Sequence, residues 1–263
     1  MAAGRADAAD RGYYVYGIVG TEQPELTGVT GVDGTPAVFV VDGDGLGAIV
    51  SEVPLAEFGD AALQSNLEDV SWVTEKVRAH EEVLERAAGQ APVLPLRFGT
   101  IYRNLDAVRG LVGHDREELT STLEELRGRR EWGVKSIVDR ERLRQAVYRT
   151  DPEMTEFADA ATSKPTGTAY LGRKRLERHL EARGDELAAR LTGEAHARLS
   201  AFAERAVRER SSGLKAAYLV DKAREDDFRR VLEEIGRDYE PFGFRFELTG
   251  PWPPYSFVGD PGR

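Results

Sequence analysis

The first strong pattern along the chain is a run of aromatic and β-branched residues from Tyr13 to Val19. Such residues favour strands, and Gly20 follows directly, so we expect a strand here. Val38 to Val41 and Ile49 to Val53 predict further strands. Glycines between these two segments supply the positive φ that a hairpin turn needs, so the pattern predicts a meander.

After Ser71, a candidate N-cap, the apolar pattern changes to the spacing of a helix. Residues of one helix face recur up to Gly89, and His80 is one of them. Val93 to Phe98 is short, apolar and interrupted by Pro95, which predicts an edge strand or the end of a strand. Two more helices are expected over 105–112 and 115–126. These elements predict an N-terminal α+β domain over 13–129, with a meander plus helices in a modified ferredoxin-like arrangement.

A second domain, 130–263, is expected to start with a strand at 132–138 and a short helix. Leucines at helical spacing over 168–210 predict one long helix, which Gly184 or Gly193 could interrupt. A strand at 214–220, a helix and a strand at 244–249 follow. This order predicts a ferredoxin-like α+β domain with its helices against one face of the sheet. A segment rich in proline and aromatic residues ends the domain.

Composition narrows the functional classes. The 263 residues carry a net charge of −10, which disfavours generic nucleic-acid binding, and they include no cysteine. Residues 1–12 are small or charged and read as a disordered tail without the apolar core of a signal peptide. No apolar run approaches the roughly 20 residues of a membrane span. We therefore expect a cytoplasmic protein of two domains.

The search for catalytic, cofactor-binding or metal-binding residues finds none. None of the four histidines stands in a metal-ligand spacing. His80 lies on an apolar helix stripe, where a hydrogen-bonded core histidine is favoured over a catalytic role. The glycines from Gly43 to Gly47 fit a hairpin better than a phosphate loop. A calcium loop starting at Asp42 fails because its twelfth position is Val53.

Three stretches resemble one known family. They are Tyr14 to Gly17 (YVYG), His80-Glu81 followed by Val93 to Thr100 (VLPLRFGT), and Leu248 to Val258 (LTGPWPPYSFV). Together they resemble the gas vesicle GvpF/GvpL family over about Tyr13 to Val258. The last stretch is the most specific, because its prolines, tryptophan and tyrosine rarely coincide.

The resemblance implies a gas vesicle accessory or minor structural protein with two α+β domains, one of them ferredoxin-like. It implies binding to the main shell protein GvpA and to other accessory Gvp proteins, in support of vesicle nucleation and assembly. The expected location is the cytoplasm and the gas vesicle, and neither an enzymatic activity nor a cofactor is implied. The alternative is a small-molecule-binding regulatory protein or an enzyme on a ferredoxin-like scaffold, since fold does not fix function.

Candidate interaction residues come from these motifs. In the final stretch the prolines fix φ, and Trp252, Tyr255 and Phe257 offer large aromatic surfaces. They could seal the core as a chain end folds back, or form a partner-binding patch. Arg97 and Phe98 of VLPLRFGT are candidates on the same basis, and an internal ion pair or backbone hydrogen bond is favoured for Arg97.

Overall fold

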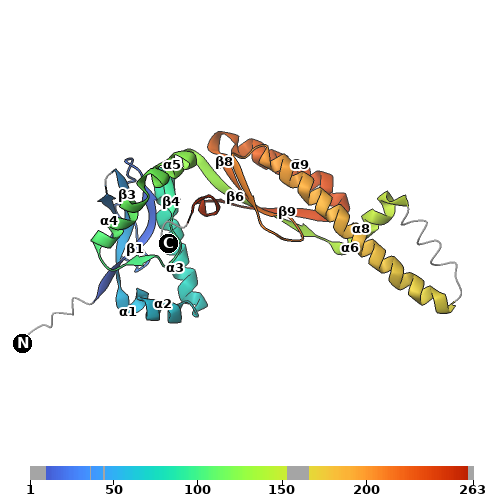
Figure 1. Cartoon of the computed structure of the whole chain (residues 1–263), viewed down its shortest axis with the longest axis horizontal. Helices are drawn as coiled ribbons and strands as arrows, with labels where there is room; N and C mark the ends of the chain where they lie inside the picture. Colours follow the sequence, from blue (N-terminus) through green and yellow to red (C-terminus); the bar gives the residue numbers. More distant parts are fainter. Residues whose placement is uncertain (1–9, 36, 44, 153–165, 260–263) are drawn as a thin grey trace, which may run out of the picture. The chain divides into compact units, whose positions relative to one another are not determined.

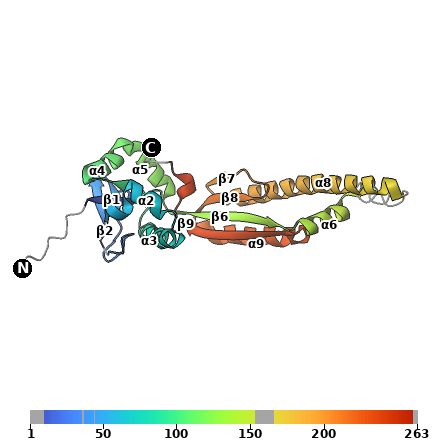
Figure 2. The ribbon, with the colours of Figure 1, turned by 90° about the horizontal axis from the view of Figure 1, so that it is seen from below.

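The computed structural model describes residues 10–35, 37–43, 45–152 and 166–259 (Figures 1 and 2). The chain forms two compact units. The first contains the residues up to Arg130 together with those from Trp252 onward, and the second contains Glu131–Pro251. Each unit has its own hydrophobic core and is described by itself.

The first unit is built on one antiparallel sheet. Its strands are β1 (Arg11–Val19), β2 (Val38–Gly43), β3 (Leu46–Pro54), β4 (Val93–Pro95) and β5 (Ile101–Tyr102). The order is β2-β3-β1-β4, and β5 also pairs with β1. The β2–β3 hairpin is present, but the predicted meander is wrong, because β1 pairs with β3 and not with β2. Strand β4, which contains Pro95, lies at the end of the order, as the interrupted apolar run predicts.

Helices cover both faces of this sheet. They are α1 (Leu55–Phe58), α2 (Asp60–Asn66), α3 (Val70–Ala88), α4 (Leu105–His114) and α5 (Arg116–Leu126). Tyr14 and Tyr16 of β1 pack with α3, whereas Val15 and Ile18 pack with α4 and α5. Because side chains alternate along a strand, β1 supplies both cores, and nearly all of it is buried.

Two further predictions for this unit are corrected. Ser71 is not the N-cap of α3. The helix starts at Val70, and its N-cap is Asp69, whose side chain accepts hydrogen bonds from the backbone N–H groups of Ser71 and Trp72. The expected disordered tail, 1–12, overlaps β1, since Arg11 and Gly12 pair with Pro54 and Val53. Residues 1–9 of that tail lie outside the described residues.

The second unit contains a four-stranded sheet with the order β7-β8-β6-β9. Its elements are β6 (Arg129–Val138), α6 (Arg140–Thr150), α8 (Thr166–Ser200), β7 (Arg205–Arg208), β8 (Lys215–Asp221), η1 (Lys222–Arg224), α9 (Glu225–Tyr239), η2 (Glu240–Phe242) and β9 (Phe244–Trp252). Apart from the additional α6, this chain order and strand order are those of a ferredoxin-like layer. The predicted α+β class is confirmed.

The core of the second unit joins the sheet to α8 and α9. Trp132 and Tyr218 from the strands pack in one cluster with Leu199 of α8 and with Phe228 and Ile235 of α9. Both helices contribute to the same cluster, so they lie against one face of the sheet, as the sequence predicts.

The long helix is shorter at its C-terminal end than predicted. We expected it over 168–210, but α8 ends at Ser200 and runs through Gly184 and Gly193 without a break. Arg205–Arg208 instead pair with β8 as an edge strand. Backbone pairing with β8 thus overrides the helical spacing of Phe202 and Ala206.

The domain assignment also changes at the C-terminus. The expected second domain, 130–263, included the proline- and aromatic-rich end of the chain. From Trp252 onward the described residues belong to the first unit, where Tyr255 and Val258 pack against its two clusters. Hydrophobic burial and specific hydrogen bonds with α3 decide this placement, and neither follows from position along the sequence.

Gly243 gives a test of the second unit. Its φ is +83°, and an added Cβ would lie 2.8 Å from the carbonyl oxygen of Asp139. Gly243→Ala should therefore lower the free energy of unfolding by about 1–3 kcal/mol. Urea titrations measure this change. In the control Gly110→Ala, on α4, a Cβ meets nothing within 4 Å, so that variant should be neutral or slightly stabilising.

Candidate functional site

One face of α3 carries polar groups into the core of the first unit. Lys76 and His80 are buried there, in line with Val83, Leu84 and Ala87. Their spacing follows the helix period, so a single stripe faces β1. The sequence identified this stripe and His80. It missed Lys76, since a lysine on an apolar stripe is ordinarily read as exposed.

His80 is the centre of a hydrogen-bond chain that we call the His80 network: Tyr14, His80, Tyr255 and Glu81. The hydroxyl of Tyr14 lies 2.9 Å from Nδ1 of His80 and accepts the backbone N–H of Gly99 at 3.0 Å. On the other side, Nε2 of His80 lies 3.0 Å from the hydroxyl of Tyr255. That hydroxyl donates to Oε1 of Glu81 at 2.9 Å.

These contacts assign the protons along the network. Tyr255 gives its one hydroxyl proton to Glu81, so it accepts from His80, and Nε2 carries the ring proton. Nδ1 is then the acceptor, and Tyr14 donates to it. With His80 neutral and Glu81 ionised, both imidazole nitrogens and Oε1 of Glu81 are paired, whereas the buried Oε2 of Glu81 has no hydrogen-bond partner in the described part of the chain. The network thus fixes both the tautomer and the charge of His80.

Burial sets the protonation of the network. Desolvation lowers the pKa of His80 from 6.5 to about 4, with a smaller opposing effect from the backbone of Leu96. Burial also raises the pKa of the Tyr14 hydroxyl. For Glu81, burial raises the carboxyl pKa, while the hydrogen bond from Tyr255 opposes that shift. Tyr14 and His80 are therefore both neutral at pH 7.

Aromatic rings enclose His80. The ring of Tyr16 is stacked on it at 5.6 Å, and those of Tyr14 and Phe98 meet it edge-on at 5.7 and 5.9 Å. The hydroxyl of Tyr16 lies 2.8 Å from Oγ of Ser51 and accepts the N–H of Val32. The cage leaves both imidazole nitrogens engaged with tyrosine hydroxyls. This arrangement suits a structural role rather than proton transfer to a substrate.

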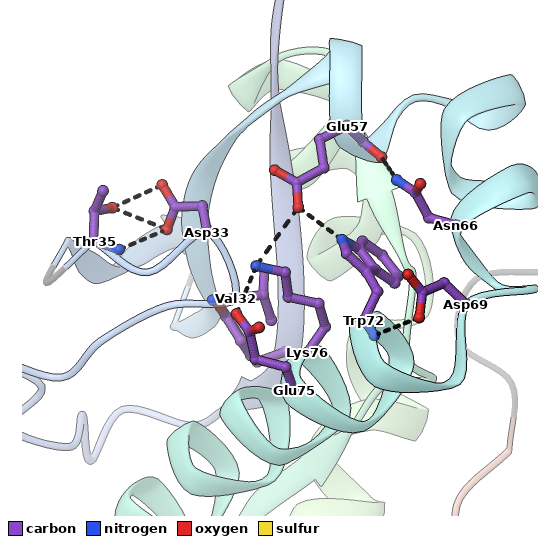
Figure 3. Close-up of polar contacts among 10 residues, drawn as sticks. Val32, Asp33, Thr35, Glu57, Asn66, Asp69, Trp72, Glu75 and Lys76 are labelled. Atoms are coloured by element: carbon purple, nitrogen blue, oxygen red, sulfur yellow. Dashed lines mark hydrogen bonds and ion pairs between the residues drawn. The ribbon is translucent and has the colours of Figure 1, made fainter.

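A second polar cluster ties α1 to α3 (Figure 3). Oε1 of Glu57 accepts a hydrogen bond from Nε1 of Trp72 at 2.8 Å and lies 3.5 Å from Nζ of Lys76. Lys76 is only 8% exposed, and its ammonium group also lies 3.1 Å from Glu75. A buried ammonium is costly unless it is paired, so Glu57 and Glu75 offset its desolvation.

The predicted site residues separate into two groups. Tyr255 and Phe98 meet around His80, and Phe257 is buried nearby in the chain, 4% exposed. Trp252, by contrast, is 43% exposed, and Arg97 is exposed as well. Each of the two motif stretches therefore contributes one residue beside His80 and one exposed residue. In the described part of the chain, no three His, Asp or Glu side chains gather as a metal site, and no helix is long and apolar enough to cross a membrane.

The profile of the family described as "Gas vesicle synthesis protein GvpL/GvpF" matches residues 12–259. The chain belongs to the GvpL/GvpF family. It is 37% identical to gas vesicle protein L of Streptomyces sp. (strain CB03234), over 96% of this chain and 94% of that protein. It is 26% identical to gas vesicle protein F1 of Halobacterium salinarum, over 93% of this chain and 92% of that protein.

Solved structures agree on the fold. The crystal structure of GvpF from Anabaena sp. PCC7120 matches with a TM-score of 0.72 at 23% identity, covering 94% of this chain and 97% of that chain. GvpF from Microcystis aeruginosa matches with a TM-score of 0.66 at 23% identity, covering 94% and 98%. The recognised family and its two-unit α+β fold are confirmed, and the family assigns this protein a role in gas vesicle assembly.

The His80 network predicts a pH dependence of stability. The folded state resists protonation of His80 down to about pH 4, whereas the unfolded chain takes up that proton below about 6.5. The contribution of His80 to the free energy of unfolding should therefore fall by up to about 3 kcal/mol as the pH drops through this window, and not change further below it. Denaturant titrations of the wild type and His80→Gln measure the difference, which should vanish in the variant.

Glu81 acts in the opposite sense at the lower end of this window. Its raised pKa adds stability below its unfolded pKa, and that contribution is lost as the pH rises through the folded value. Comparing Glu81→Gln with the double variant Glu81→Gln/His80→Gln isolates His80. If these two proteins had parallel stability profiles between pH 4 and 6.5, the neutral, buried state of His80 would be refuted.

The aromatic end of the chain gives a second test. Phe257→Ala removes a buried ring and should cost about 3–5 kcal/mol of unfolding free energy. Trp252→Ala removes a side chain that is 43% exposed and should cost less than about 1 kcal/mol. Thermal melts of both variants compare the two rings directly. Equal losses would show that Trp252 seals the core.

Proposed function

We propose that this protein binds the shell protein GvpA and other accessory Gvp proteins, and that it supports vesicle nucleation and assembly without catalysing a reaction. The observation that carries the proposal is an exposed apolar pair at the junction of α2 and α3. Leu67 is 50% exposed and Val70 is 78% exposed. Exposed apolar side chains grouped in this way favour contact with another protein.

Helix caps and hydrogen bonds hold the backbone around this apolar pair in place. Leu67 caps the C-terminal end of α2, and Asp69 caps the N-terminal end of α3, so the junction is short and held by hydrogen bonds. The Glu57–Trp72 bond fastens the same region to α1. A rigid apolar surface loses little entropy when it binds. The apolar pair is therefore well placed to hold a hydrophobic subunit.

The aromatic motif adds a second candidate contact. Trp252 is exposed, while Tyr255 and Phe257 anchor its segment to the first unit. We propose Trp252 as a docking residue, with Tyr255, Phe257 and Phe98 as its support. Exposed Arg97, in the other motif, is proposed as a polar contact at the edge of such an interface.

The acidic composition fits a factor that holds an aggregation-prone partner. A net charge of −10 favours solubility of the complex and opposes non-specific association with other acidic molecules. We propose that the protein acts in the cytoplasm and at the growing vesicle, where shell subunits would otherwise aggregate through their apolar surfaces.

A pull-down with GvpA tests the function and the surface separately. The wild-type full chain should retain GvpA at micromolar concentrations, and Leu67→Ser/Val70→Ser should weaken binding by about tenfold or more. Phe39→Ser is the control, because Phe39 is also exposed but lies on β2. No retention of GvpA by the folded wild type would contradict the function. Unchanged binding by the double variant would contradict only the surface.

A further inference from the structure

The second unit contains a cavity that the proposed function does not use. Its volume is about 660 Å³, and α9 and β9 supply most of its lining. Leu232 and Gly236 come from α9, and Phe244, Phe246 and Leu248 come from β9. The volume is within the range of binding pockets in proteins.

β9 is the last strand in the order of its sheet. It has nine residues and pairs with β6, and in the described part of the chain no strand lies beyond it. An edge strand presents backbone N–H and C=O groups that a further strand can pair with. The cavity therefore borders a free backbone edge.

The apolar β9 side chains that line the cavity recur with a period of two. Phe244, Phe246 and Leu248 pack toward the cluster that contains α9, and the last two are only half-buried. An added strand places its own side chains on that face with the same period. These three apolar side chains thus match an extended peptide that has an apolar residue at every second position.

The α9 side of the cavity is open where the peptide would lie. A Cβ at Gly236 would meet no atom within 4 Å. Charges around the cavity are of both signs, since Arg142, Arg229 and Arg245 line it together with Asp139, Glu233 and Glu240. Arg142 pairs with Glu240 at 2.7 Å, and Arg229 lies over the ring of Trp132 at 4.6 Å. Mixed charges favour an uncharged peptide backbone over an anionic ligand.

We propose that β9 accepts an extended segment of another protein as an additional strand, whose alternate apolar side chains enter the cavity against Phe246 and Leu248. A second copy of this chain that offered the other edge of its sheet to β9 would be a less suitable partner. That edge, β7, has four residues with arginine at both ends. The proposal goes beyond the assembly function above, because its site lies in the second unit and the surface at Leu67 and Val70 lies in the first.

A screen of the full chain against a library of nine-residue peptides tests the proposal. Selected peptides should share apolar residues at alternate positions. Gly236→Leu should fill the cavity and weaken their binding by about tenfold or more. Gly193→Leu is the matched control, because Gly193 also lies within a helix and its Cβ would meet nothing within 4 Å. Melting curves should show that both variants are folded.

Backbone methylation identifies the mode of binding. In a selected peptide, N-methylation of the amides that alternate along one edge should abolish binding, whereas methylation along the other edge should not. Equal loss in both series, equal binding by Gly236→Leu and the wild type, or a library that yields no binder would overturn the proposal. Self-association of the full chain that Gly236→Leu abolishes would also overturn it, since a second copy would then occupy the edge.

Discussion

The first unit depends on the need to satisfy a buried imidazole. His80 lies in a core of aromatic and aliphatic side chains, where an unpaired ring nitrogen would cost about 1–3 kcal/mol. One nitrogen is met by Tyr14, which is close in space because β1 packs on α3. The other nitrogen is hydrogen-bonded to Tyr255, which lies 175 positions after His80 in the sequence. The demand for one hydrogen bond therefore helps hold the end of the chain against α3.

That contact explains why the two motif stretches occur together. VLPLRFGT places Phe98 against the imidazole and Gly99 beside the hydroxyl of Tyr14. The later motif supplies Tyr255 from the short 3-10 helix Tyr255–Phe257, which follows two prolines. They are two parts of one packing arrangement around His80, with Glu81 as the anionic end of the network. Trp252 and Arg97 lie in the same motifs but are exposed.

Local patterns were sufficient to predict most elements. Strands β1 to β4 of the first unit, the stripe on α3 and the ferredoxin-like class of the second unit follow from periodicity and turn residues, whereas β5, α1 and α2 were not predicted. The prediction that His80 is a hydrogen-bonded core residue is confirmed by Tyr14 and Tyr255. The predictions that were wrong concern features that tertiary contacts decide. The end of α8 is set by the pairing of β7 with β8, and the unit to which Tyr255 belongs is set by α3. The ion pairs of Lys76 with Glu57 and Glu75 could not be predicted from the sequence either.

The first unit is assembled from two separated stretches of sequence, with the whole second unit inserted between them. Synthesis on the ribosome runs from the N-terminus, so β1 and α3 emerge well before the segment that contains Tyr255. Until residues 252–258 have been made, Nε2 of His80 lacks the hydroxyl that completes its network. The second unit has no such dependence, because Glu131–Pro251 is continuous. The unit that begins first along the chain is therefore the last to be finished.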